Sequence, residues 1–140
     1  YGPGFARLTY SHTDVETNGG APLSTNASYQ GVLQGDMFSL EIGHSWDDLG
    51  LRVGSTSELA LSNDDPEKNG FPKLDTYFVT NLYGEWTPAS LSAVTLRVDA
   101  LNILDRDYID RTTPGYDSSQ VGEPYHEPGR TFLVSAKVAF

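Results

Sequence analysis

Six stretches of this sequence alternate so that uncharged side chains fall on one flank and charged side chains on the other. A period of two residues is that of a β-strand, whose successive side chains point to opposite faces. No stretch repeats apolar residues at helical spacing over three turns. We therefore predict an all-β fold, an antiparallel meander of about six strands. The predicted strands are Phe5–Thr13, Met37–Trp46, Leu51–Leu61, Leu74–Trp86, Ala93–Asn102 and one within the closing stretch Gly129–Phe140.

The connections between the predicted strands alternate in length. Long polar segments reach to about Gln34, cover Ser62–Lys73 and run from about Asp105 to Gly129, whereas Asp47–Gly50 and Thr87–Ser92 are short turns. Because each antiparallel strand reverses direction, the long connections should leave one end of the sheet and the short turns the other. Transmembrane β-barrels have this arrangement, with longer extracellular loops and short periplasmic turns.

The distribution of charge indicates what the uncharged flank contacts. That flank carries no formal charge, and His44 is its one titratable member. A charge facing lipid at the bilayer midplane costs about 2–4 kcal/mol, so a barrel wall should show this separation. A half-buried sheet of a soluble protein gives a similar pattern and stays open as an alternative. The charged flank holds Arg52, Glu58, Asp75, Glu85, Arg97, Asp99 and Lys137.

Aromatic residues stand where a membrane interface would place them. Trp46 and Trp86 each precede a short turn, and Phe140 should reach the same end of the sheet. Aromatic girdles mark the interfaces of outer-membrane barrels. A strand of about ten residues, tilted by about 45°, crosses roughly 24 Å, which matches the apolar band of such a barrel.

Six strands are too few to close a membrane barrel, because closed bacterial barrels start at about eight. An open sheet would expose two edges of unpaired backbone groups, and each such group costs several kcal/mol in hydrocarbon. We therefore expect residues 1–140 to be the C-terminal segment of a larger barrel. Its first and last strands should pair with strands outside these residues.

Composition excludes several other classes of function. The net charge of −10 repels phosphate, so a nucleic acid is not expected as a partner. The chain has no cysteine, which excludes disulfides, thiolate metal sites and cysteine nucleophiles. It also has no run of about 18 apolar residues that would form a membrane-spanning helix.

Three segments resemble the closing strands of one family. The segment "LRVDALNILDRDYID" (Leu96–Asp110) resembles the penultimate strand of TonB-dependent outer-membrane receptors, with Asn102–Tyr108 as its most specific part. The segment "LDTYFVTNLYGEWTP" (Leu74–Pro88) resembles their strand two before the last, and "EPGRTFLVSAKVAF" resembles their closing strand. The first 70 residues resemble the family only loosely.

The resemblance implies a roughly 22-stranded transmembrane β-barrel in the outer membrane of a Gram-negative cell, with an N-terminal plug in its lumen. Such receptors actively import a scarce metal chelate, such as a siderophore, heme or a cobalamin. The implied partners are the lipid bilayer, the remainder of the barrel and the plug, the energy-coupling protein of the inner membrane and the barrel-assembly machinery. The plug lies outside this chain. The closing strand resembles the assembly signal, carried by Phe140 and Val138.

Candidate ligand contacts lie in the long loops, where a barrel faces the cell exterior. His12 ends the first strand, and Tyr116, Tyr125 and His126 belong to the last loop. Tyrosines can line a vestibule for an aromatic chelate, and histidines can ligate heme or a metal. One or two histidines without a converging cluster usually bind no ligand, and the tyrosines could equally lie in the interfacial belt. We predict no resident metal and no cofactor.

The function predicted is active transport across the outer membrane, not catalysis. The chain lacks the G-x-S-x-G and H-E-x-x-H motifs of hydrolases and zinc proteases. Two alternatives stay open at this point: a soluble β-sandwich binding module and an outer-membrane barrel enzyme.

Overall fold

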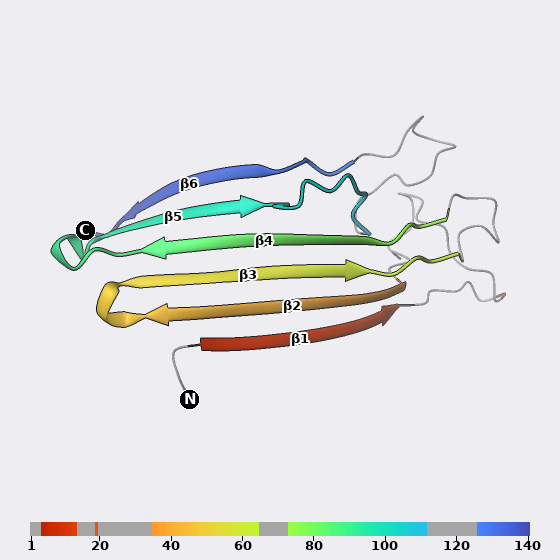
Figure 1. The fold of residues 1–140 in the computed structure, drawn as a ribbon, viewed down its shortest axis with the longest axis horizontal. Coiled ribbons are helices and arrows are strands. Elements are labelled where there is room, and N and C mark those ends of the chain that lie inside the picture. The colour runs from red at the N-terminus through yellow and green to blue at the C-terminus, as the bar shows by residue number, and fades with distance from the viewer. Residues whose placement is uncertain (1–3, 14–18, 20–34, 65–72, 112–125) are drawn as a thin grey trace.

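The computed structural model describes residues 4–13, 19, 35–64, 73–111 and 126–140. Six strands form one antiparallel sheet in chain order, with no α-helix in these ranges (Figure 1). The predicted all-β meander is therefore confirmed. The elements are β1 (Gly4–Thr13), β2 (Gly35–Trp46), η1 (Asp47–Leu49), β3 (Leu51–Ala60), β4 (Tyr77–Trp86), η3 (Ala89–Leu91), β5 (Val94–Leu101) and β6 (Thr131–Val138), where η1 and η3 are single 3₁₀ turns.

The connections are sorted by end as predicted. The two short turns, η1 and η3, lie at one end of the sheet with the C-terminus, and the long connections leave the other end (Figure 1). We call these the turn end and the loop end. Gly50 closes the first turn with φ 60°, and its N–H donates to the Asp47 carbonyl at 3.1 Å. Its left-handed backbone is one that glycine adopts without strain.

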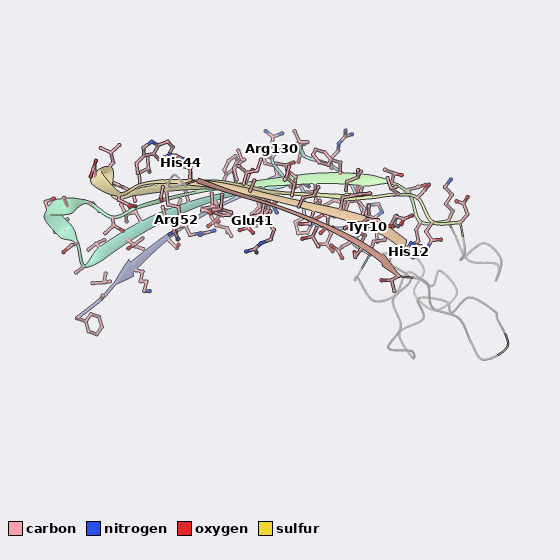
Figure 2. The ribbon with its side chains drawn as sticks, turned by 90° about the horizontal axis from the view of Figure 1, so that it is seen from below. Tyr10, His12, Glu41, His44, Arg52 and Arg130 are labelled. Atoms are coloured by element: carbon pink, nitrogen blue, oxygen red, sulfur yellow. The ribbon has the colours of Figure 1, made fainter. Side chains whose placement is uncertain are left out.

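The strand register joins the uncharged flanks into one continuous face. Leu8 lies opposite Leu40 across β1 and β2, and Val98 lies opposite Val134 across β5 and β6. Directly opposed residues of antiparallel strands point to the same side, so the register carries one face across all six strands. We call this side the apolar face and the other side the charged face. Figure 2 shows His44 and Arg52 on opposite sides of the sheet.

The apolar face is not covered by a second layer in the described part of the chain. The side chains of Leu8 and Val134 are 72% and 78% exposed. A soluble β-sandwich would bury such a face against another sheet, whereas the described strands all belong to one sheet. This architecture does not support the sandwich alternative.

The fourth strand begins later in the structure than the sequence predicts. Leu74 was predicted on the apolar face with Phe78, but β4 begins only at Tyr77. Leu74 instead forms an isolated bridge with Asn63 and is 2% exposed. The chain has left the ladder at this point, so alternation no longer determines which way Leu74 and Asp75 face.

The expectation of an apolar face without formal charge is wrong at the loop end. β2 begins at Gly35, two residues before the predicted start, and this extension puts Asp36 opposite His12. Both residues therefore lie on the same face of the sheet as Tyr10 and Phe38. The charge therefore lies at the rim of the apolar face, beyond its last aromatic pair.

The small buried core lies on the charged face near the loop end. Ala60, Tyr77 and Val79 are buried there, with Met37 and Tyr108 packed against them. Tyr108 comes from the connection after β5, so part of that connection folds back over the sheet. No helix in the described ranges is long and apolar enough to cross a membrane.

Candidate functional site

The connection after β5 turns sharply because of two residues with left-handed backbone. Asn102 has φ 48° and Asp105 has φ 54°. Asn and Asp are the non-glycine residues that tolerate this conformation best. The Asn102 N–H donates to Asn81 Oδ1 at 2.8 Å, so the turn is fastened to β4 as soon as β5 ends.

The Asn102 side chain ties both ends of the last connection together. Its Nδ2 donates to the Arg106 carbonyl at 2.8 Å and to the Pro128 carbonyl at 3.2 Å, and its Oδ1 accepts from the Arg106 N–H at 2.9 Å. Asp105 Oδ1 also accepts from the Arg130 N–H at 2.8 Å, just before β6. Asn102 is 4% exposed, so these hydrogen bonds are shielded from water.

The residues that follow this turn, up to Arg111, pack on the charged face through one aromatic pair and one buried cation. The rings of Tyr77 and Tyr108 lie 4.8 Å apart. Arg111, only 5% exposed, donates from Nη2 to the carbonyls of Leu61 (2.6 Å) and Asp75 (2.8 Å). Burial and, after it, the nearby carboxylates of Glu127, Asp110 and Glu58 raise the pKa of Tyr108.

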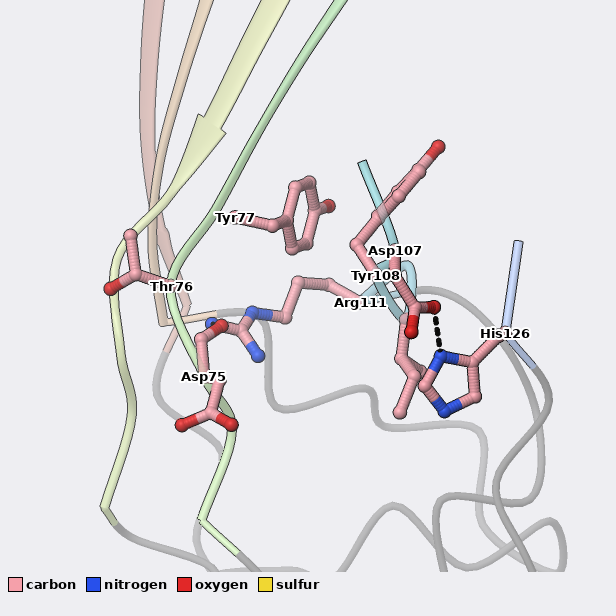
Figure 3. A pocket seen from close by; sticks show the side chains of 8 residues that line it. Asp75, Thr76, Tyr77, Asp107, Tyr108, Arg111 and His126 are labelled. Atoms are coloured by element: carbon pink, nitrogen blue, oxygen red, sulfur yellow. Dashed lines mark hydrogen bonds and ion pairs between the residues drawn. The ribbon is translucent and has the colours of Figure 1, made fainter. Parts of the chain in front are cut away.

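A small pocket of about 120 Å³ lies where this segment meets the start of β4 (Figure 3). His126 Nδ1 is hydrogen-bonded to Asp107 Oδ1 at its edge. A water molecule takes about 30 Å³ of liquid volume, so this pocket admits a few waters or a small polar group. A chelate as large as heme could rest against it but could not enter. The lining residues are Asp75, Thr76, Tyr77, Asp107, Tyr108, Ile109, Arg111 and His126.

A second polar cluster lies at the rim of the apolar face. Asp36 Oδ1 accepts from the Tyr10 hydroxyl at 2.7 Å and lies 2.8 Å from His12 Nδ1. His12 is therefore an outward-facing residue at the loop end, paired with a carboxylate. The sequence placed it at this end but gave no sign of the Asp36 contact, because that contact depends on the register of β1 and β2.

The structure does not bring the predicted ligand contacts together. His12 lies in β1, at one edge of the sheet, and His126 precedes β6, at the other edge. Tyr116 and Tyr125 fall outside the described residues. Among those that are described, no group of three or more His, Asp or Glu side chains could hold a metal ion.

The proposed assembly-signal residues lie at the turn end. Val138 ends β6 opposite Val94, on the apolar face. The Ala139 N–H still donates to the Ala93 carbonyl at 2.9 Å, so the ladder continues one step beyond the strand. Phe140 is fully exposed at the chain end.

The charged face is organised by an ion-pair network around Arg97. Its guanidinium contacts Asp99 at 2.5 Å and Glu85 at 3.1 Å and lies 4.6 Å from the centre of the Tyr83 ring. Glu85 is directly opposite Arg97 across β4 and β5, as cross-strand pairing favours. Arg7 and Glu41 form a second pair, between β1 and β2, at 3.2 Å.

Comparison with known proteins gives one group of relatives. The chain is 29% identical over 135 residues to the Heme transporter BhuA of Brucella ovis and to that of Brucella suis, and 28% identical to that of Brucella abortus. The alignments cover 94% of this chain. The chain is similar to these heme transporters along nearly all of its length.

These relatives are named as transporters, which is the kind of protein that the resemblance of the closing strands implies. The chain spans about a fifth of the length of these curated relatives, 20% in each alignment. No family model matches the chain. No solved structure matches it either.

Proposed function

We propose that this chain is the last part of the barrel wall of a TonB-dependent outer-membrane receptor that imports a metal chelate of the heme class. The observation that carries this proposal is the apolar face, which is exposed, continuous over six strands and backed by a charged face. A sheet facing hydrocarbon on one side and an aqueous or protein-filled lumen on the other needs this division.

Aromatic residues bound the apolar face at both ends. At the turn end, Trp46 and Trp86 both lie opposite Leu51 and so stand at one level. At the loop end, Tyr10 lies opposite Phe38, with their ring centres 5.0 Å apart. Such rows fit the two girdles of a barrel at its membrane interfaces.

The distance between these aromatic rows suits a membrane. Phe38 and Trp46 lie eight positions apart in β2, which is about 27 Å along a strand and roughly 20 Å along the membrane normal at a tilt of about 45°. The Asp36–His12 pair then lies beyond the apolar band, at headgroup level, where a charge costs little.

The sheet edges support a larger barrel. The outer edges of β1 and β6 have no neighbouring strand among the described residues, and hydrocarbon does not tolerate open edges. The relatives are about five times longer than this chain, long enough to supply the missing strands and a plug. The proposed partners are therefore the bilayer, the rest of the barrel, the plug, the energy-coupling protein and the barrel-assembly machinery.

The heme class is favoured over a siderophore by the names of the relatives alone. His12, Tyr116, Tyr125 and His126 remain the proposed ligand contacts, in the loops or at their base. Of these, His126 is best placed to contact a ligand, because it lines a pocket together with Tyr108 and Arg111. We propose no catalytic step and no resident cofactor for this chain.

Growth on heme tests this proposal. A strain that lacks the full-length gene should fail to grow with heme as its sole iron source, and the wild-type gene should restore growth. His126→Ala should weaken the restoration at low heme concentration. His44→Ala is the matched control, because His44 lies on the apolar face next to Trp46 and should leave growth unchanged. Restoration by a ferric siderophore but not by heme would contradict the heme class.

A further inference from the structure

The pocket of about 120 Å³ at the loop end is lined by charges of opposite sign that differ in their exposure to water (Figure 3). The cation, Arg111, is only 5% exposed. The two carboxylates are in contact with solvent, since Asp75 is an exposed residue and the Asp107 side chain is 80% exposed. Water screens an exposed charge, whereas a charge in buried surroundings acts more strongly on its neighbours. An anion inside the pocket would therefore be attracted by Arg111 more strongly than it is repelled by the two carboxylates.

The Arg111 guanidinium is held in a fixed position. Its Nη2 donates to the carbonyls of Leu61 and Asp75, and its central carbon lies 5.7 Å from the centre of the Tyr77 ring. Carbonyl groups and an aromatic ring orient a cation but do not carry the full negative charge that would neutralise it. The planar fork of N–H donors in a guanidinium matches the two oxygens of a carboxylate. A carboxylate is therefore the anion that this part of the pocket suits.

His126 lies at the edge of the same pocket, where a carboxylate orients its ring. Its Nδ1 is hydrogen-bonded to Asp107 Oδ1, so its Nε2 points away from that carboxylate (Figure 3). Histidines that bind a metal usually hydrogen-bond to a carboxylate, a carbonyl or water through their other ring nitrogen. A chelate whose metal contacts His126 would lie across the opening of the pocket, and a side arm of that chelate could reach inside.

The size of the pocket selects the arm of a chelate and not the whole chelate. Its volume of about 120 Å³ corresponds to about four molecules of liquid water. A carboxylate on a short alkyl arm suits this volume, whereas a porphyrin does not. Heme has two such arms, the propionates at one edge of its porphyrin. In the proposed barrel the pocket would open into the lumen at the loop end, where the chelate enters.

We propose that this pocket receives one carboxylate arm of the imported chelate, a propionate in the case of heme, and that Arg111 is its counter-ion. This inference rests on the proposed function, because only an importer would bring a chelate to the charged face. It adds the chemical group by which the chelate is recognised and the residue that recognises it.

Binding of heme and of heme dimethyl ester to the detergent-solubilised full-length protein tests this assignment. The ester has the same porphyrin and iron, but both of its carboxylates are blocked and uncharged. Because hydrogen bonds to charged groups are strong, the wild-type protein should bind heme at least about tenfold more tightly than the ester. Titrations followed by the absorbance of the porphyrin measure both affinities.

Two variants test whether the difference arises at this pocket. Arg111→Gln removes the cation, and Ile109→Phe fills the pocket while the cation is kept. Each should lower the affinity for heme to about that for the ester and leave the affinity for the ester unchanged. Ile109→Phe keeps the test available if Arg111→Gln does not fold. Arg106→Gln, at an exposed position of the same segment, is the matched control and should retain the preference for heme.

Equal affinities of the wild-type protein for heme and the ester would overturn the carboxylate site and leave the heme class standing. The same holds if both variants keep the preference for heme, or if they lose affinity for heme and the ester alike, since the pocket residues would then only support the fold. A protein that binds neither compound would refute the heme class and, with it, this inference.

Discussion

Gly54, on the charged face, shows how closely side chains of neighbouring strands are packed. A Cβ added to Gly54 would lie 2.6 Å from atoms of the Tyr83 ring, which lies against it from the neighbouring strand. That ring also carries the Arg97 guanidinium over its face. The glycine thus makes room for an aromatic ring, and the ring in turn supports the ion-pair network. Alternation predicts the faces of these residues, but the ring contact depends on which two strands are neighbours.

Gly54→Ala should therefore destabilise the full-length protein, because the added methyl displaces the Tyr83 ring and disturbs Arg97. Overpacking of this kind costs about 1–3 kcal/mol of unfolding free energy. Gly84→Ala is the matched control: Gly84 lies in β4, and no atom comes within 4 Å of its added Cβ. Thermal unfolding of the detergent-purified full-length protein measures the effect of both substitutions. Equal stability of the two variants would argue against the ring contact.

At the scale of elements, most of the sheet could be predicted from the sequence, and the segment after β5 could not. The observed bounds of β1, β3 and β5 differ from the predicted bounds by at most one residue at each end. The prediction works there because successive side chains of an unbroken strand point to alternate faces. The pattern failed at Leu74, where the chain leaves the ladder. It also could not place Arg111, which binds the Leu61 carbonyl 50 positions away.

Arg111→Gln should loosen the segment that covers the charged face, because it weakens two hydrogen bonds from a buried cation to the carbonyls of Leu61 and Asp75. Bonds to charged groups contribute about 1.5–3 kcal/mol each, so local opening should rise at least about tenfold. Hydrogen exchange of residues 103–111 in the full-length protein measures this opening. Arg106→Gln, at an exposed position of the same segment, should leave the exchange unchanged. Unaltered protection in Arg111→Gln would show that the segment is held by other contacts.

At the scale of the whole molecule, the sheet has the properties expected of one part of a larger β-barrel. Among the residues that the structure describes, it has two open edges, an exposed apolar face and a core of only a few residues on the opposite side. A sheet with these properties would associate through its edges and its apolar face in water. The strand number led us to expect a larger barrel, and the chain spans about a fifth of the length of its curated relatives. The ligand of the proposed transport could not be predicted, because the long connections carry no specific motif.

In the proposed orientation of the sheet, the apolar face meets lipid and the charged face does not. The chain has no cysteine, so single cysteines can be introduced along β5, from Val94 to Leu101, in the full-length protein freed of any other cysteine, and spin-labelled in bilayers. Labels at 94, 96, 98 and 100 should respond to oxygen dissolved in the lipid. Labels at 95, 97, 99 and 101 should be shielded from it. Loss of this two-residue alternation, or its reversal, would contradict the account.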